Sequence, residues 1–202
     1  MGCLEIFIGM LGLFSKPISI FEDYLESMKK VFCLVGMPGS GKSAVARILS
    51  AEGYRVVRTG DVTDDEAKKQ GLELNEVNER KIREGLRKLH GDDVYAKLSH
   101  PKFGEEDKIA VDGVYNEAEW EYWAEKYPEA RLVALISDTG ERHNRLVSRN
   151  VRPMDFEDAK ARDEAQLVHL GMGKVLDRAH VVVENNGSYD ELKDRVLGLL
   201  DV

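Results

Sequence analysis

One octapeptide, residues 36–43, combines the residue types that can bind a polyphosphate. It reads Gly-Met-Pro-Gly-Ser-Gly-Lys-Ser and matches the phosphate-loop pattern G-x-x-x-x-G-K-[ST] at every fixed position. Its glycines allow the backbone to curve so that successive amide N–H groups point toward the phosphates. Lys42 can then bridge the β- and γ-phosphates, and the Ser43 hydroxyl can bind Mg²⁺. The octapeptide therefore predicts a site for ATP with Mg²⁺.

The segments on either side of the octapeptide fit this interpretation. The apolar run at 31–35 predicts a buried strand that enters the loop, and residues 43–49 predict a helix that leaves it. The start of that helix adds a partial positive charge near the phosphates. A glycine-rich turn that binds nothing is the alternative, but strand, Lys-Ser pair and helix together favour phosphate binding.

Strand and helix patterns alternate along the rest of the chain. Apolar runs predict further strands at 54–58, 108–112, 131–136 and 180–183, and helices are predicted at 65–70, 75–90, 117–126, 140–150, 155–169 and 189–200. Buried strands alternating with helices are typical of a parallel sheet covered on both faces. We therefore expect an α/β fold with three layers and a five-stranded parallel sheet, in one domain at 28–202.

The composition limits the classes of partner. The 202 residues are 43% hydrophobic and 33% charged, which is typical of a globular chain. The formal net charge of −8 argues against a general nucleic-acid binder. The two cysteines, Cys3 and Cys33, provide neither a disulfide framework nor a zinc spacing, which suits a reducing cytoplasm. We expect a cytoplasmic monomer or homodimer, with Cys33 in the core.

Residues 1–27 are predicted to lie outside the domain. Their apolar stretch at 4–14 carries Glu5 and is too short to span a bilayer, so no stable membrane insertion is expected. Residues 17–30 follow a short amphipathic pattern. The segment is either a poorly ordered extension or an arm that docks on a membrane surface or a partner. We favour the extension, because termini are usually disordered unless they are tied down.

Two acidic residues follow predicted strands, at the sheet edge where ligands bind in such folds. Asp112 ends the third strand and precedes Gly113, where a carboxylate can hold Mg²⁺ directly or through water. Asp61 follows the second strand in Thr59-Gly60-Asp61, where it can orient an acceptor hydroxyl and take its proton. The alternatives are a turn-forming role for Asp112 and a helix N-cap for Asp61.

Arginines gather in the segment 142–165, which we expect to form a helical lid. Arg142, Arg145 and Arg149 are spaced to share one helix face. Their guanidinium groups can neutralise a migrating phosphoryl group while lid closure excludes water. Ligand contact is expected first from Arg145 and Arg149, then from Arg152 and Arg162, and Arg142 is left out. The alternative is a solvated helix with internal ion pairs.

The polar loop after the fifth strand, residues 184–188, lies at the same sheet edge. Its Asn186 and Gly187 can contact adenine, although a plain turn with Ser188 as a helix cap fits equally well. We expect catalytic roles for Lys42, Asp61, Arg145 and Arg149, and Mg²⁺ binding by Ser43 and Asp112. The residues expected to bind ATP are Gly36, Met37, Pro38, Gly39, Ser40, Gly41, Lys42, Ser43, Ala44, Arg149, Asn186 and Gly187.

These motifs resemble those of small P-loop kinases of the nucleoside-monophosphate-kinase type. Thr59-Gly60-Asp61 and Asp112-Gly113 are similar to the elements that end strands two and three of adenylate kinases. Residues 179–187, Ala-His-Val-Val-Val-Glu-Asn-Asn-Gly, resemble the end of dephospho-coenzyme A kinases. From Met28 onward the chain is most similar to an archaeal group of dephospho-CoA-kinase-like and adenylate-kinase-related proteins. The resemblance implies a P-loop NTPase fold, ATP with Mg²⁺ as donor, an acceptor region after strand two and a lid after strand four.

One departure from adenylate kinases bears on the acceptor. Those enzymes follow Asp-Gly with an aromatic residue, Pro and Arg, whereas this chain has Val114-Tyr115-Asn116 and lacks that monophosphate-binding arginine. Arg83 or Arg87 can supply the missing contact, unless they only cover a solvated helix face. We expect an ATP-dependent kinase that acts on the ribose 3′-hydroxyl of dephospho-CoA, with a nucleoside monophosphate as the alternative acceptor. A nucleotide-dependent switch or accessory protein that hydrolyses ATP slowly is the alternative of another class.

Overall fold

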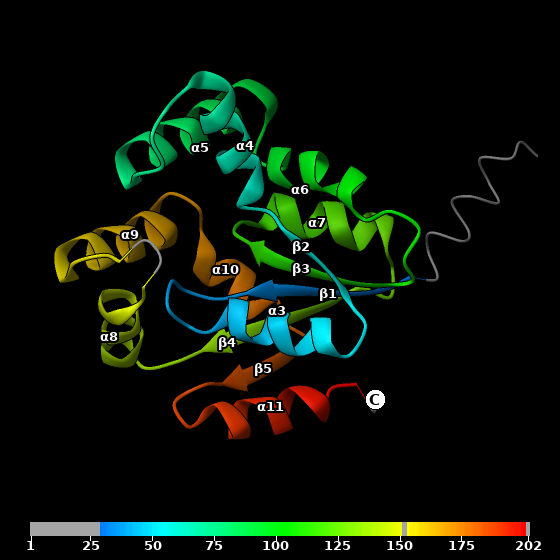
Figure 1. Ribbon diagram of the computed structural model, residues 1–202. Coiled ribbons are helices and arrows are strands. Elements are labelled where there is room, and N and C mark those ends of the chain that lie inside the picture. Colours follow the sequence, from blue (N-terminus) through cyan, green and yellow to red (C-terminus); the bar gives the residue numbers. More distant parts are fainter. Residues whose placement is uncertain (1–28, 151–152, 201–202) are drawn as a thin grey trace, which may run out of the picture.

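Five parallel strands form one sheet in the order β2-β3-β1-β4-β5 (Figure 1). Each neighbouring pair is parallel, so all five carboxyl ends lie at the same edge. The strands are β1 (Lys30–Val35), β2 (Arg55–Arg58), β3 (Lys108–Val114), β4 (Arg131–Ile136) and β5 (Val181–Glu184). The predicted α/β fold with a five-stranded parallel sheet is therefore confirmed.

The computed structural model describes residues 29–150 and 153–200. The predicted N-terminal extension, including Cys3, and the lid residue Arg152 lie outside these ranges. The predicted helix at 17–30 also lies outside them except for its last two residues, and Lys30 already belongs to β1. Within the described ranges, no helix combines the length and the apolar composition needed to cross a lipid bilayer.

Helices pack on both faces of the sheet, which explains why the strand sequences are continuously apolar. On one face, α3 (Lys42–Ala51) and α11 (Tyr189–Leu197) pack against alternate residues of β1, Phe32 and Leu34. On the other face, α7 (Glu117–Lys126) and α10 (Met172–Asp177) pack against Val31, Cys33 and Val35.

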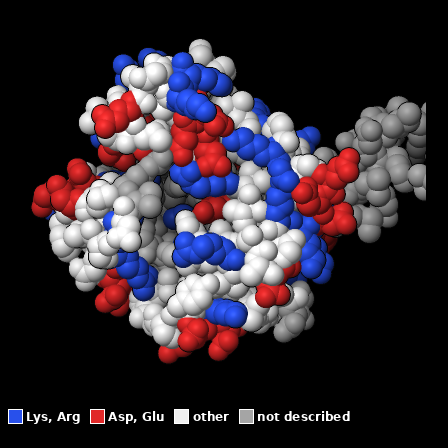
Figure 2. Space-filling model, viewed as in Figure 1, with Lys and Arg blue, Asp and Glu red and all other residues white. Residues whose placement is uncertain are grey.

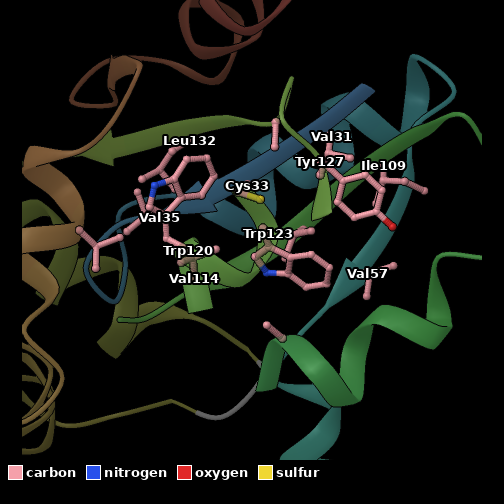
Figure 3. Close-up of a cluster of buried hydrophobic side chains, with 14 of the residues drawn as sticks. Val31, Cys33, Val35, Val57, Ile109, Val114, Trp120, Trp123, Tyr127 and Leu132 are labelled. Atoms are coloured by element: carbon pink, nitrogen blue, oxygen red, sulfur yellow. The ribbon is translucent and has the colours of Figure 1, made fainter. Parts of the chain in front are cut away.

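The second face carries the aromatic part of the core. Figure 3 shows Trp120, Trp123 and Tyr127 stacked against the side chains of β1 and β3. Cys33 is completely buried among them, and burial raises the pKa of its thiol. The prediction that Cys33 is a core residue is therefore confirmed.

Two helical pairs stand beyond the carboxyl edge of the sheet (Figure 1). The first pair, α4 (Asp61–Gln70) and α5 (Glu76–His90), follows β2 and leads to α6 (Val94–Ser99) and a 3₁₀ turn, His100–Lys102. The second pair, α8 (Thr139–Ser148) and α9 (Phe156–Val168), follows β4 and corresponds to the predicted lid.

Several predicted boundaries are wrong, and two helices were not predicted. Helix α4 begins at Asp61 instead of residue 65, because Asp61 and Asp64 suit the positive end of a helix dipole. Helix α11 ends before Gly198, and α8 ends at Ser148, two residues earlier than predicted. The unpredicted α6 and α10 have only six residues each, too few to show a helical period in the sequence.

Candidate functional site

The phosphate loop joins β1 to α3 through glycine conformations that other residues rarely adopt. Gly39 has φ +78°, and a Cβ there would collide with the backbone of Arg142. Gly41 has φ +105°, and a Cβ there would collide with the side-chain amide of Asn185. The loop glycines are therefore required by close packing as well as by the path of the backbone.

Three side chains from other elements hold the loop carbonyl groups. Asn185 Nδ2 donates to Ser40 O at 2.8 Å, and Arg142 Nη1 donates to Pro38 O at 3.0 Å. Arg145 Nη1 donates to Gly39 O at 3.4 Å and to the Ser137 hydroxyl at 3.1 Å, while its Nη2 donates to Asn185 O at 2.8 Å. Because these groups tie the loop to β4, α8 and β5, the loop is preorganised before any ligand binds.

Arg142 makes the strongest connection between the lid and the phosphate loop. Its side chain is 6% exposed and forms a two-pronged ion pair with Asp163 of α9, at 2.9 and 2.6 Å. His143 Nε2 lies 3.1 Å from the same Asp163 carboxylate. The spacing of the arginines does not reveal this bracing role, because nothing in a run of spaced arginines shows which one meets a buried carboxylate. That Arg142 does not contact the ligand directly stays a prediction.

Lys42 lies at the start of α3 and turns back onto the loop. Its Nζ donates to Gly36 O at 2.5 Å and to Met37 O at 3.2 Å. Burial lowers the pKa of Lys42 to about 8, opposed by the charge of Asp112 and assisted by the charges of Arg162 and Arg142. The ammonium group is therefore held in a place where a polyphosphate would stabilise its charged form.

Ser43 and Asp112 meet beside Lys42. The Ser43 hydroxyl donates to Asp112 Oδ2 at 3.1 Å, and Asp112 is only 7% exposed. The two residues are 69 positions apart in sequence but come together because β1 and β3 are neighbours, with Leu34 opposite Asp112. One hydroxyl and one carboxylate are oxygen ligands of the type Mg²⁺ uses beside a bound polyphosphate.

The part of the chain that the structure describes contains no group of three or more His, Cys, Asp or Glu that could hold a metal by itself. The Ser43–Asp112 pair fits an ion that takes its other ligands from phosphate oxygens and water, which is the usual arrangement for Mg²⁺.

Gly113 forms a bulge in β3 directly after Asp112. Leu34 of β1 lies opposite Asp112, but the next residue, Val35, lies opposite Val114, so Gly113 is the extra residue. Its φ is +114°, and the Thr59 hydroxyl donates to its carbonyl at 2.7 Å. The prediction that the strand ends at Asp112 is wrong, because the strand continues through the bulge to Val114.

Gly113→Ala is expected to lower the free energy of unfolding by about 1–3 kcal/mol, because a Cβ combines an unfavourable φ with a tight contact. The Cβ would lie 2.8 Å from Thr59 Oγ1 and 2.9 Å from the Tyr115 ring. The matched control is Gly53→Ala, where φ is +84° and nothing lies within 4 Å. Urea unfolding of both variants measures the difference, and an equal loss in the two would show that the contacts beside Asp112 carry no strain.

Asp61 reaches the expected sheet edge but is paired there. It is the first residue of α4, and its carboxylate accepts from Arg58 Nη1 at 2.5 Å. The same guanidinium nitrogen lies 2.9 Å from Asp64. The N-cap position belongs to Gly60, so the capping alternative for Asp61 is wrong.

The other predicted arginines occupy different surroundings. Arg149 has an extended backbone just after α8, so it does not share a helix face with Arg142 and Arg145 as expected. Arg162 of α9 faces Glu76 of α5 at 3.5 Å. The Arg87 side chain is 9% exposed and donates to Glu119 at 2.8 Å, so the interpretation of Arg87 as part of a solvated helix face is wrong.

Two functional candidates, Tyr115 and Glu119, were missed in the sequence. Tyr115 follows the Asp112–Gly113 bulge, and its backbone N–H donates to Glu119 Oε2 at 2.8 Å. Glu119 is 1% exposed, and burial raises its pKa against the opposing effect of Arg87. In the sequence, Asn116 three residues before Glu119 indicates a helix cap, and the structure contains this cap. The spacing gives no sign that Glu119 also fixes the turn after Asp112.

The loop after β5 also lies against the phosphate loop. Asn186 Oδ1 accepts from the backbone of Asp138 at 2.9 Å, which joins the loop to the start of α8. Ser188 accepts from the Glu191 N–H and caps α11, as predicted, and contact of Asn186 and Gly187 with adenine stays a prediction. Gly187 lies between them, next to Glu191. Asn185 holds the phosphate loop, although only its neighbours Asn186 and Gly187 were predicted to bind ATP.

The sequence around this site matches a known family. Residues 33–169 match the family model described as an AAA domain. Proteins named UPF0200 align with the chain at 34% identity in Methanosarcina barkeri (85% of this chain and 94% of the relative) and at 36% in Methanococcus maripaludis (79% and 90%). The chain belongs to the UPF0200 family. A further member, from Methanothrix thermoacetophila, is 30% identical over 85% of this chain and 97% of its own length.

Solved structures similar to this UPF0200 chain include two that are named as kinases. A shikimate kinase from Acinetobacter baumannii in complex with shikimate gives a TM-score of 0.54 at 16% identity, covering 88% of this chain and 96% of that one. A gluconokinase from Sinorhizobium meliloti gives 0.55 at 17% identity, covering 86% and 93%. The protein TT1252 from Thermus thermophilus gives 0.56 at 21% identity, covering 86% and 97%. At these identities the likeness shows a P-loop kinase-like fold.

Proposed function

We propose that this protein is an ATP- and Mg²⁺-dependent kinase acting on a small nucleotide-like acceptor. The observation that carries the proposal is the contact of 3.1 Å between the Ser43 hydroxyl and Asp112, directly beside Lys42 and the braced phosphate loop. Burying a carboxylate costs free energy, and a glycine-rich turn that binds no ligand has no need of a buried hydroxyl–carboxylate pair beside it.

Each part of the site has a task in this reaction. The loop N–H groups and the start of α3 bind the triphosphate, and Lys42 turns from Gly36 O to the β- and γ-phosphates. Ser43 and Asp112 would hold Mg²⁺, which neutralises charge on the phosphates when bound. Arg149, Asn186 and Gly187 border the nucleotide, while Arg145 acts through the loop that it braces.

Dephospho-CoA is the first acceptor proposed, and a nucleoside monophosphate is the second. Asp61 supports a hydroxyl acceptor, because it lies at the carboxyl end of β2 and a hydroxyl benefits from a nearby base. The absence of an arginine directly after Asp112-Gly113 in the sequence also favours the hydroxyl over the phosphate acceptor. The names of the similar kinases add shikimate and gluconate to the acceptors worth testing.

The test is ADP release from Mg-ATP by the full chain, with each acceptor added separately. Strong stimulation by one acceptor is the expected result and names the substrate. Basal hydrolysis that no acceptor changes would overturn the kinase proposal and favour a nucleotide-dependent switch or accessory protein.

Asp61→Asn is expected to lower acceptor-stimulated ADP release by about 10²-fold if the acceptor is a hydroxyl, because the variant keeps the shape but removes the base. Binding of Mg-ATP, measured by calorimetry, should not change. Asp65→Asn is the matched control, because Asp65 lies on the same helix and pairs with Lys102 on the exposed surface. If Asp61→Asn and Asp65→Asn behave alike, Asp61 is not the base.

A further inference from the structure

A carboxylate of the protein itself joins the two helical pairs that border the site. Glu76, the first residue of α5, has Oε1 at 2.5 Å from Arg83 Nη2 and Oε2 at 3.5 Å from Arg162 Nη1. Arg83 belongs to the same helix, whereas Arg162 belongs to α9 of the lid. The carboxylate therefore lies between two guanidinium groups that come from opposite sides of the site.

The two guanidinium groups lie close enough to the candidate site for their charges to act on its residues. Figure 2 shows a hollow between the α8–α9 side and the α4–α5 side, with basic and acidic atoms inside it. Beyond the effect of burial, the charge of Arg162 acts on the pKa of Lys42. Burial raises the pKa of Tyr115, which follows the bulge in β3, and the charges of Arg162 and Arg83 lower it. The pair thus lies between α5 and α9, with its charges acting on residues of the phosphate loop and of the turn after β3.

We propose that Arg83 and Arg162 form the subsite for an oxyanion group of the acceptor, a phosphate or a carboxylate, and that Glu76 fills this subsite until the acceptor displaces it. The proposal rests on the proposed kinase function, since it assigns a chemical class to the acceptor. Guanidinium groups suit this ligand, because their planar forks pair with both oxygens of a carboxylate or phosphate.

The contacts of Glu76 suit a ligand that must leave. Its side chain is 32% exposed, and its separation of 3.5 Å from Arg162 is long for an ion pair. Among residues 29–150 and 153–200, the same nitrogen of Arg162 has the Met154 sulfur, at 3.8 Å, as its second contact. A change of side-chain rotamer at Glu76 would remove its carboxylate from both arginines without moving a helix, while Arg83 would keep its contact with Glu79 at 3.4 Å.

Displacement of Glu76 would also select between anionic and neutral acceptors. Two positive charges face Glu76 and the nearby Glu79, whose carboxylate lies 3.4 Å from Arg83. A neutral acceptor gains nothing by removing Glu76, whereas an anionic acceptor restores the charge balance and keeps α5 joined to α9. The lid therefore stays closed over anionic acceptors only.

The test is calorimetric titration with inorganic phosphate, and separately with acetate, in a Lys42→Ala background that weakens phosphate binding at the loop. Glu76→Gln is expected to tighten binding by about tenfold, because it removes the competing charge and keeps the shape. Arg162→Gln and Arg83→Gln should each weaken binding by about tenfold or more. Matched controls are Glu84→Gln and Arg80→Gln, an exposed pair on α5, for which less than about a twofold change is expected.

Tighter binding of phosphate or of acceptor-like acetate in Glu76→Gln supports the subsite and shows which oxyanion it prefers. Unchanged or weaker binding in Glu76→Gln, or unchanged binding in Arg162→Gln, overturns the proposal when thermal unfolding shows the variants folded. No nucleotide is present, so this result stands apart from the kinase test. If the variants change phosphate binding as expected but no acceptor stimulates ADP release, the subsite is supported and the proposed kinase function is overturned.

Discussion

Lys42→Ala is expected to lower ADP release from Mg-ATP by about 10²-fold or more, because it removes the charge that stabilises the migrating phosphoryl group. The structure places Lys42 Nζ against Gly36 O and Met37 O, within the loop that would surround the phosphates. The variant should also bind Mg-ATP more weakly. Steady-state ADP release and calorimetry measure the two effects.

The same substitution is not expected to cost folding free energy. Burial lowers the pKa of Lys42 to about 8, so the folded state already disfavours its charge. Lys68→Ala on the exposed face of α4 is the matched control, and it should keep full activity. If Lys42→Ala keeps its turnover, or loses it only because the variant unfolds, the proposed role of Lys42 is wrong.

Asp163→Asn is expected to lower the free energy of unfolding by about 3 kcal/mol, because it leaves the buried guanidinium of Arg142 without its carboxylate. The same change should weaken Mg-ATP binding, since Arg142 also holds Pro38 O in the phosphate loop at 3.0 Å. Urea unfolding and nucleotide titration measure the two quantities. Glu164→Gln, one position along α9 and exposed, is the control for the loss of one carboxylate charge.

A double variant separates stability from loop positioning. Arg142→Met with Asp163→Leu replaces the buried pair by apolar side chains, which often restores the stability that a single change removes. Mg-ATP binding should stay weak in the double variant, because the hydrogen bond to Pro38 O is gone. Full recovery of nucleotide affinity together with stability would show that the Arg142 contact does not position the loop.

The site was only partly predictable, and the arginines show why. Arg142, Arg145 and Arg149 look equivalent in a pattern of spaced charges. In the structure Arg142 is buried against Asp163, Arg145 braces the loop through Asn185, and Arg149 lies beyond the helix end. The roles of Arg142 and Arg145 depend on partners 21 to 106 positions away in the chain. Helical spacing says nothing about such partners.

The sequence by itself determined the phosphate loop, the five strands and the acidic residue Asp112 of β3. These features are local, because backbone conformation and two-sided burial leave a short-range pattern of glycines and apolar residues. Only the tertiary structure decided that Asp112 meets Ser43, that Gly113 bulges beside them, and that Glu76 lies between Arg83 and Arg162. Such contacts arise from strand order and helix packing, which place side chains together without leaving a periodic signal in the chain.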